Sequence, residues 1–271
     1  MRSITLPDGS KIVYDETGLG AAALVMIHGY TGGRWYYENE VNTFSAQWRC
    51  IAPDLVGHGE SDKPLDRDYC VERYARDVSD IADALGLESF VLIGHSMGGM
   101  VAQRFALDHN EKGRCVGMVL ISTSSELPLR DMIAASLREE IGRYERGEWS
   151  YNENLQRSLA KSAWSDRYAD EHPEQVERAY EETLRVPEIV RMKLMLAMAE
   201  KFDVASRVKD IRIPTLVCVG SQDMLRDGSK KLAENIPGAK FRVFEGAGHM
   251  INIEAAEAIR KEIYRFLNPF F

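Results

Sequence analysis

The sequence predicts an α/β fold, in which a mostly parallel, doubly wound β-sheet carries helices on both faces and a helical segment is inserted between two strands. Three observations support this prediction. Short β-rich runs alternate with helical patterns, several of these runs are apolar at every position, and residues 124–208 contain no such run. Strands that are apolar on both faces are typical of a parallel sheet covered by helices. The 271 residues suffice for a large buried core.

Seven runs are predicted as strands. Lys11–Glu16 alternates apolar and polar residues, as a half-buried strand does, whereas Ala22–Ile27 is apolar throughout and ends at His28-Gly29. The remaining five are Arg49–Ala52, Phe90–Ile93, Val116–Ile121, Thr215–Val219 and Phe241–Phe244. Most of these runs lead directly into glycine, proline or serine, so the loops that follow them are expected at one edge of the sheet.

Two helices between these strands have clear amphipathic patterns. Val71–Leu85 carries apolar residues at helical spacing and is followed by Gly86, a natural helix stop. Ala255–Leu267 carries a second apolar stripe near the end of the chain. The repeated order of strand and helix implies right-handed crossovers and hence the doubly wound sheet.

Residues 124–208 interrupt this order and are predicted to form a helical cap, or lid, between core segments 1–123 and 209–271. Pro128, Pro173 and Pro187 divide the insertion into about four expected helices. A second small domain without function is the alternative. Several large side chains of the insertion could line an apolar acyl pocket, although packing in the core is the more frequent role of such residues; they are Trp149, Trp164, Met192, Met195 and Met198.

Composition and charge exclude several classes of function. The 34 Lys and Arg residues face 42 Asp and Glu residues, a net charge of −8, which argues against nucleic acid or an anionic membrane as a partner. We expect no signal peptide and no membrane span, and therefore a cytoplasmic protein. The four scattered cysteines are expected as free thiols, and no ligand spacing indicates a metal or another cofactor. The sequence leaves the oligomeric state open.

The segment Phe90–Met100 carries the strongest chemical signal. It places Gly94-His95-Ser96-Met97-Gly98 between an apolar strand and a helical pattern. A sharp strand-to-helix turn of this kind holds its central residue in a strained conformation and exposes its side chain, and the two glycines avoid collisions with neighbouring elements. Ser96 is therefore the predicted nucleophile, whereas a glycine-rich strand exit without function is the alternative.

Serine requires a base, and His249 is the favoured histidine. It lies in the glycine-rich loop Gly246–Gly248 after the last predicted strand, which can reach the edge of the sheet where Ser96 lies. His109 and His172 are expected at the surface, and His95 on a turn that directs it away from the site. If His249 acts as a neutral base, the rate of hydrolysis is expected to rise with pH.

A carboxylate must orient the imidazole, and Asp223 is the predicted residue because it follows strand Thr215–Val219 closely. Asp227, expected in an exposed turn, and Glu126 are the two competitors. The oxyanion that develops on the substrate requires donors, which we assign to the backbone N–H groups of Tyr30 and Met97. Tyr30 follows His28-Gly29 in a glycine-rich loop, for which a plain tight turn is the alternative.

With these residues in place, the chain resembles the serine hydrolases of the α/β-hydrolase superfamily, in the branch of esterases, lactonases and haloperoxidase-like proteins. The matching segments, in family order, are His28-Gly29, Pro53–Asp62, Gly94–Gly99, Gly220–Asp223 and Gly246–His249. The resemblance covers the chain except for the insertion. It implies that Asp54–Asp62 shapes the loop beneath the active site, so Asp54 and His58 are expected to have structural roles.

The resemblance narrows the activity but does not fix it. Serine at position 96 disfavours dehalogenases and epoxide hydrolases, which use aspartate as the nucleophile. Hydrolysis of carboxylic esters or lactones through an acyl-enzyme is the leading expectation, with a small-molecule substrate that is apolar on the acyl side. Cleavage of carbon–carbon bonds in vinylogous diketones, enol-lactone hydrolysis and perhydrolysis stay open. A small-molecule receptor that retains a slow triad is the alternative from another class.

Overall fold

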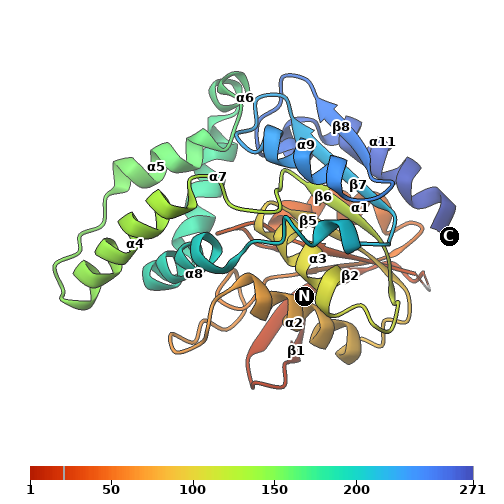
Figure 1. The fold of residues 1–271 in the computed structure, drawn as a ribbon, viewed down its shortest axis with the longest axis horizontal. Helices are drawn as coiled ribbons and strands as arrows, with labels where there is room; N and C mark the ends of the chain where they lie inside the picture. The colour runs from red at the N-terminus through yellow and green to blue at the C-terminus, as the bar shows by residue number, and fades with distance from the viewer. Residues whose placement is uncertain (21, 271) are drawn as a thin grey trace.

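The computed structural model describes residues 1–20 and 22–270 and has the predicted α/β architecture (Figure 1). Its strands form one sheet in the order β1-β2-β4-β3-β5-β6-β7-β8. Their bounds are β1 (Arg2–Thr5), β2 (Lys11–Thr17), β3 (Ala23–Ile27), β4 (Arg49–Pro53), β5 (Phe90–His95), β6 (Cys115–Ile121), β7 (Thr215–Gly220) and β8 (Lys240–Phe244). The sheet from β4 to β8 is parallel, as predicted.

One edge of the sheet is antiparallel and contains a strand that the sequence did not predict. Strand β1 pairs antiparallel with β2, and β2 pairs antiparallel with β4. Strand β1 has only four residues, three of them exposed, so it lacks the hydrophobic pattern that marks the other strands. It extends the sheet on the side away from the predicted site.

Helices cover both faces, because successive side chains of each strand point to opposite sides. On β3, Val25 and Ile27 belong to one core cluster and Leu24 and Met26 to the other. The first cluster includes residues of α2 (Val71–Ala84), α3 (Met97–Asp108) and α9 (Arg226–Asn235). The second includes residues of α1 (Glu38–Phe44) and α11 (Ala256–Leu267). Shorter helical segments are η1 (Arg34–Tyr37), η2 (Val208–Asp210), α10 (Ile251–Glu254) and η3 (Asn268–Phe270).

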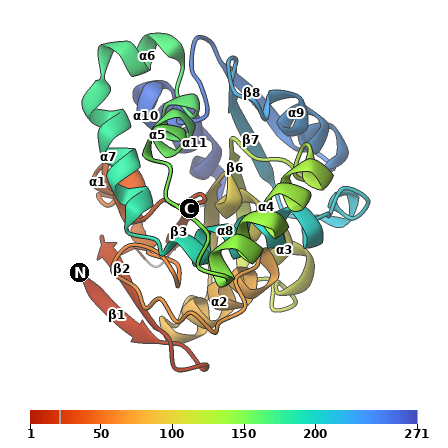
Figure 2. The same ribbon diagram turned by 90° about the vertical axis from the view of Figure 1, so that its left-hand side faces the viewer.

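The insertion between β6 and β7 contains five α-helices rather than the four expected (Figure 2). They are α4 (Arg130–Glu145), α5 (Glu153–Ser162), α6 (Asp166–Glu171), α7 (Pro173–Leu184) and α8 (Glu188–Lys201). The prediction missed the breaks before α5 and α6, because no proline marks either of them. Instead, the hydroxyl of Ser165 accepts a hydrogen bond from the backbone N–H of Tyr168 and begins α6.

The insertion leaves and rejoins the sheet at one place, where Glu126 and Asp203 form an antiparallel bridge. Helix α8 packs Val190, Leu194 and Met198 into the core cluster that contains α2 and α3. Helices α4 to α8 lie beyond the carboxyl ends of the parallel strands, with α4 beside α8 and with α5 and α6 beside α7 (Figures 1 and 2). This end of the sheet also carries the predicted site residues.

Two further expectations concern the cysteines and the membrane. Cys50, Cys70, Cys115 and Cys218 are all free, as predicted, and the structure shows that all four are buried. Among the residues that the structure describes, no helix has both the length and the apolar character that crossing a membrane requires.

Candidate active site

Ser96 occupies the sharp turn between β5 and α3. Its backbone has φ 51° and ψ −116°, a conformation that costs a non-glycine residue about 1–3 kcal/mol. A β-carbon at Gly94 would lie 2.3 Å from the carbonyl oxygen of Gly98, and one at Gly98 would lie 2.1 Å from that of Ile27. Both glycines are therefore required by close backbone contacts, as the sequence analysis anticipated.

The loop after β3 lies directly against this turn. A β-carbon at Gly29 would come within 3.2 Å of Cβ of Ser96, so Tyr30, the next residue, begins next to the nucleophile. Met97 is the first residue of α3, where backbone N–H groups have no partner within the helix. The residues that carry the two expected oxyanion donors thus belong to two segments that meet at Ser96.

His249 and Asp223 form a hydrogen-bonded pair. Nδ1 of His249 lies 3.0 Å and 3.1 Å from the two carboxylate oxygens of Asp223 and donates to them. Burial alone would raise the pKa of Asp223, but the neighbouring His249 and the hydrogen bonds to the carboxylate, including one from the backbone N–H of Leu225, hold it below its usual value. Asp223 is therefore a stable anion that can fix the orientation of the imidazole.

Close packing of two loops brings this pair together. Asp223 follows β7 and His249 follows β8, two strands that are neighbours in the sheet. A β-carbon at Gly220 would lie 2.2 Å from the carbonyl oxygen of Gly248, so the absence of a side chain allows the loops to touch. The backbone N–H of Gln222 also donates to the carbonyl of Ala247 at 2.9 Å.

The two competing carboxylates lie elsewhere. Glu126 contacts Lys231 of α9, with Oε1 2.9 Å from Nζ. Asp227 is exposed in the first turn of α9, rather than in the turn that the sequence suggested. Among the described residues, Asp223 is thus the carboxylate that contacts His249.

The position of His95 differs from the expectation, because its side chain packs against the loop that carries His249 instead of pointing away from the site. Its Nε2 donates to the backbone carbonyl of His249 at 3.0 Å, and the two imidazole rings meet edge to face with centroids 4.8 Å apart. The ring of Tyr36 covers its other side at 4.4 Å. Burial lowers the pKa of His95 well below its usual value, so the ring is neutral. The chain turns sharply only at Ser96. His95 is still the last residue of β5, and its side chain contacts the loop that carries His249.

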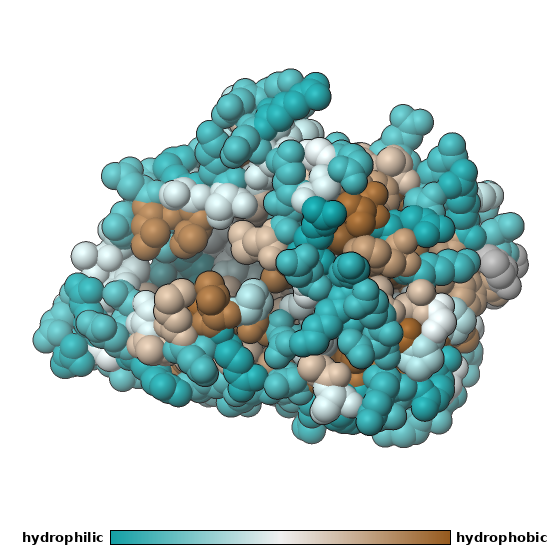
Figure 3. All heavy atoms as spheres, turned by 45° about the horizontal axis from the view of Figure 1, so that its top comes forward, coloured by the Kyte–Doolittle hydropathy of each residue, from teal (hydrophilic) through white to brown (hydrophobic). Residues whose placement is uncertain are grey.

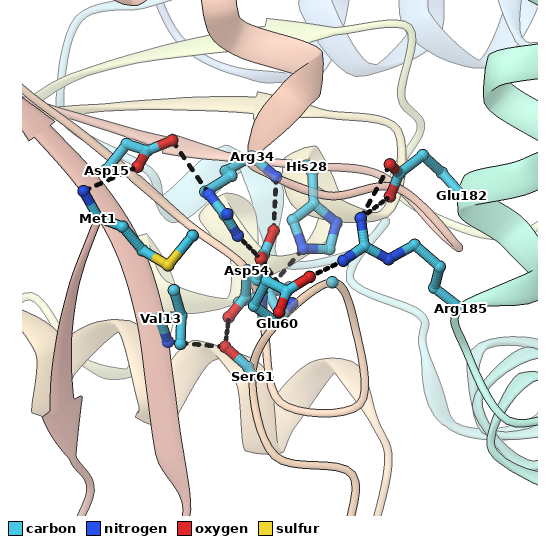
Figure 4. Close-up of polar contacts among 12 residues, drawn as sticks. Met1, Val13, Asp15, His28, Arg34, Asp54, Glu60, Ser61, Glu182 and Arg185 are labelled. Atoms are coloured by element: carbon cyan, nitrogen blue, oxygen red, sulfur yellow. Dashed lines mark hydrogen bonds and ion pairs between the residues drawn. The ribbon is translucent and has the colours of Figure 1, made fainter.

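Asp54 and the neighbouring loop support the site from below, as expected from the resemblance. Asp54 is almost fully buried and accepts hydrogen bonds from the backbone N–H groups of Arg34 and Glu60, at 2.7 Å and 2.9 Å (Figure 4). His28 accepts from the backbone N–H of Leu55 at 3.0 Å through Nε2. His58 is fully buried against the ring of His28. These contacts fix the loop that carries Tyr30.

The insertion is attached to the core along one side. Glu60 pairs with Arg185 at the end of α7 (Figure 4), and Glu38 pairs with Arg178 at 2.7 Å. The hydroxyl of Tyr30 donates to the backbone carbonyl of Arg191 on α8 at 3.0 Å. The loop that carries one of the proposed oxyanion donors therefore contacts the insertion directly.

The residues expected in an acyl pocket have mixed positions. Trp164, Met192 and Met198 are buried, and Trp164 and Met198 belong to the two core clusters. Trp149 and Met195 are only partly buried. Other apolar residues of the insertion are largely exposed, namely Leu129, Met132, Leu155 and Leu159. Figure 3 shows a hollow at this end of the molecule with hydrophobic surface on both sides of it.

The described residues contain no group of three or more His, Cys, Asp or Glu side chains that could hold a metal ion.

Comparisons with known proteins agree with the fold. The family model described as alpha/beta hydrolase fold matches residues 22–256. A 2-hydroxymuconate semialdehyde hydrolase of Pseudomonas putida is 30% identical over 81% of this chain and 76% of its own. A thermophilic esterase of Thermogutta terrifontis has a TM-score of 0.86 at 26% identity over 99% of both chains. Est816, described as an N-acyl homoserine lactone degrading enzyme, has a TM-score of 0.82 at 25% identity over 98% and 100%.

Proposed function

Because this chain belongs to the alpha/beta hydrolase family, we propose that it is a serine hydrolase that cleaves carboxylic esters or lactones through an acyl-enzyme. The observation that carries the proposal is that Ser96 occupies a strained turn whose preceding residue, His95, contacts the backbone of His249, which in turn pairs with Asp223. The pair supplies a base whose Nδ1–H is fixed, which leaves Nε2 to accept a proton. No cofactor is required for this chemistry.

In the first half of the reaction, Oγ of Ser96 attacks the carbonyl carbon while Nε2 of His249 takes the hydroxyl proton. The carbonyl oxygen becomes an anion, which the backbone N–H groups of Tyr30 and Met97 bind. When the intermediate collapses, the alkoxide leaves with the proton from His249 and the acyl group stays on Ser96. A lactone retains its leaving hydroxyl on the same molecule.

In the second half, His249 activates a water molecule that attacks the acyl-enzyme. The same two N–H groups stabilise the second oxyanion, and Ser96 leaves with the proton that His249 took from water. Asp223 stabilises the imidazolium in both halves, because its pKa is held low and it stays ionised.

The insertion, with residues 124–208 as its bounds, is proposed to act as a cap that selects the substrate. Its exposed Leu129, Met132, Leu155 and Leu159 and the hollow in Figure 3 favour an acyl group that is apolar. The names of two similar proteins, an esterase and an N-acyl homoserine lactone degrading enzyme, support esters and lactones as the substrate class. The four free thiols favour a reducing, cytoplasmic location.

Hydrolysis of a carbon–carbon bond in a vinylogous diketone is the second candidate, because the chain is similar to a 2-hydroxymuconate semialdehyde hydrolase. Enol-lactones are a related candidate, because they contain the ester bond of a lactone together with a carbon–carbon double bond next to it. Parallel assays with a short-chain ester, a homoserine lactone and a vinylogous diketone at equal concentration rank the three activities by kcat/KM. If the protein is instead a receptor that retains a slow triad, it should bind a ligand tightly and turn over none of the three substrates at an appreciable rate.

Labelling with a fluorophosphonate tests the nucleophile directly. We expect modification at Ser96 alone, and a Ser96→Ala variant that keeps its fold but loses at least about 10³-fold in kcat, since no other group can form the acyl-enzyme. Ser162→Ala, at an exposed position on α5, is the matched control and retains full activity. Labelling of another serine, or turnover by Ser96→Ala, contradicts the proposal.

A further inference from the structure

The loop that carries His249 is joined to the insertion by a main-chain hydrogen bond. The backbone N–H of His249 donates to the carbonyl of Ala163 at 2.9 Å. Ala163 lies in the short turn between α5 and α6, about 86 positions away in the sequence. The position of the proposed base therefore depends on a segment of the insertion as well as on the core.

A single carboxylate reinforces this junction. Oε2 of Glu254, the last residue of α10, accepts the backbone N–H of Gly248 at 3.0 Å and that of Ser165 at 3.2 Å. One N–H belongs to the histidine loop and the other to the turn of the insertion. Hydrogen bonds of this kind to an ionised acceptor are roughly twice as strong as those between neutral groups.

The two segments approach so closely that a side chain would separate them. A β-carbon at Gly248 would lie 2.5 Å from the backbone nitrogen of Ser165 and 2.7 Å from the carbonyl carbon of Trp164. Trp164 is only 5% exposed and belongs to the same core cluster as Ala247 and Met250. The turn at 163–165 is thus packed as part of the core, although it belongs to the insertion.

The backbone of His249 is held on its other side as well. Its carbonyl accepts a hydrogen bond from Nε2 of His95 at 3.0 Å, while its ring donates to Asp223. Three independent contacts therefore fix the main chain and the ring of one residue. Of these, the contact with the insertion is the one that Glu254 braces.

We propose that Glu254 is a positioning residue, which holds the His249 loop and the 163–165 turn of the insertion together and thereby sets the imidazole against Ser96. The inference rests on the proposed function, because it assigns His249 as the base. Loss of the carboxylate leaves two backbone N–H groups without their acceptor at a close-packed junction, so the loop shifts. A displacement of about 1 Å in a catalytic group can lower the rate by about 10²-fold.

Glu254→Ala tests the proposal with a chromogenic ester that the wild-type protein hydrolyses. We expect kcat to fall about 10- to 100-fold while KM changes less than about threefold, since Glu254 contacts the loop and not the substrate. The rate at which a fluorophosphonate labels Ser96 falls by the same factor, because that rate reports activation of the serine by His249. Glu254→Gln keeps an oxygen acceptor and restores most of kcat.

Glu257→Ala, an exposed glutamate in the first turn of α11, is the matched control and leaves both rates unchanged. If Glu254→Ala does not fold, Glu254→Asp tests the proposal instead. Its side chain is a carboxylate that is one methylene shorter, so its oxygens lie too far from the N–H groups of Gly248 and Ser165. Wild-type kcat in the folded Ala or Asp variant, or a rise in KM without a fall in kcat, overturns the inference. Failure of the proposed function is distinct, because the wild-type protein would then neither hydrolyse esters nor label at Ser96.

Discussion

Burial disfavours the ionised form of Asp223, whereas the neighbouring groups stabilise it. Its side chain is fully buried, yet the contact with His249 and the hydrogen bond from Leu225 keep its pKa below the usual value. The charge is therefore present at neutral pH and serves to orient one imidazole. Glu126 and Asp227 carry the same charge but have solvent or Lys231 as partners.

This difference predicts the effect of neutralising each acid. Asp223→Asn should lower kcat by up to about 10⁴-fold with little change in KM, because an amide favours the wrong tautomer of His249. Asp227→Asn and Glu126→Gln should each retain at least about half of wild-type kcat. Steady-state kinetics of the three variants with one ester measure this. If Glu126→Gln alone abolished turnover, the assignment of Asp223 would be wrong.

At the scale of elements, the site is assembled from loops that follow adjacent strands. Because β3, β5, β7 and β8 are parallel, the loops that carry Tyr30, Ser96, Asp223 and His249 all emerge at one edge of the sheet. Glycines determine how closely these loops and helix α3 approach one another. Gly98 is the tightest case, since its α-carbon faces the backbone of β3.

Gly98→Ala is therefore expected to destabilise the protein by at least about 2 kcal/mol and to lower activity, because its β-carbon would overlap the carbonyl of Ile27, which cannot move aside. Gly142→Ala, inside α4, is the matched control. Its β-carbon would meet only the end of the flexible Arg146 side chain, so it should stabilise the helix by about 0.5–1 kcal/mol. Urea unfolding of both variants gives the comparison, and equal shifts would contradict the argument.

Across the whole molecule, neutral histidines support the site from within the core. His28, His58 and His95 are buried, and burial lowers the pKa of each. Their rings contact the loops that carry Tyr30 and His249. Each of these three histidines therefore binds fewer protons in the fold than in the unfolded chain at acidic pH.

The sign of the pH dependence follows from this difference. In the unfolded chain each imidazole titrates near pH ~6.5, whereas in the fold it stays neutral to lower pH. The three histidines together should therefore lower the free energy of unfolding as the pH drops below about 6.5, by up to about 4 kcal/mol per pH unit. Glu40 and Asp77 offset part of this fall, because burial raises their pKa values in the fold to about 7 and about 6. Urea unfolding at pH 7, 6 and 5 measures the slope.

A pair of variants separates the buried histidines from the exposed ones. His58→Gln should reduce the slope by about one proton, because the variant has one titrating group fewer. His172→Gln, at a side chain that is 43% exposed, is the matched control. Equal slopes in the wild-type protein and in His58→Gln between pH 7 and 5 would refute the account.

Much of the fold could be predicted from local pattern, and the misses have physical causes. All seven predicted strands are present, because each carries its own hydrophobic run. Strand β1 was missed because its few residues are mostly exposed. The breaks before α5 and α6 were missed because the side chains of Asn152 and Ser165, rather than prolines, begin those helices. His95 was misplaced because its direction depends on the loop that packs beside it, which lies far away in the sequence.

By itself, the sequence determined the α/β class, the order of the elements and the residue types at positions 96, 223 and 249, because hydrophobic periodicity and glycine-flanked turns are local properties. Only the tertiary structure decided which carboxylate contacts His249, that His95 supports it, and that Ala163 and Glu254 join its loop to the insertion. These contacts connect residues between 26 and 154 positions apart or bind through backbone groups that every residue possesses. Such contacts leave no pattern in a sequence, because packing of distant segments creates them.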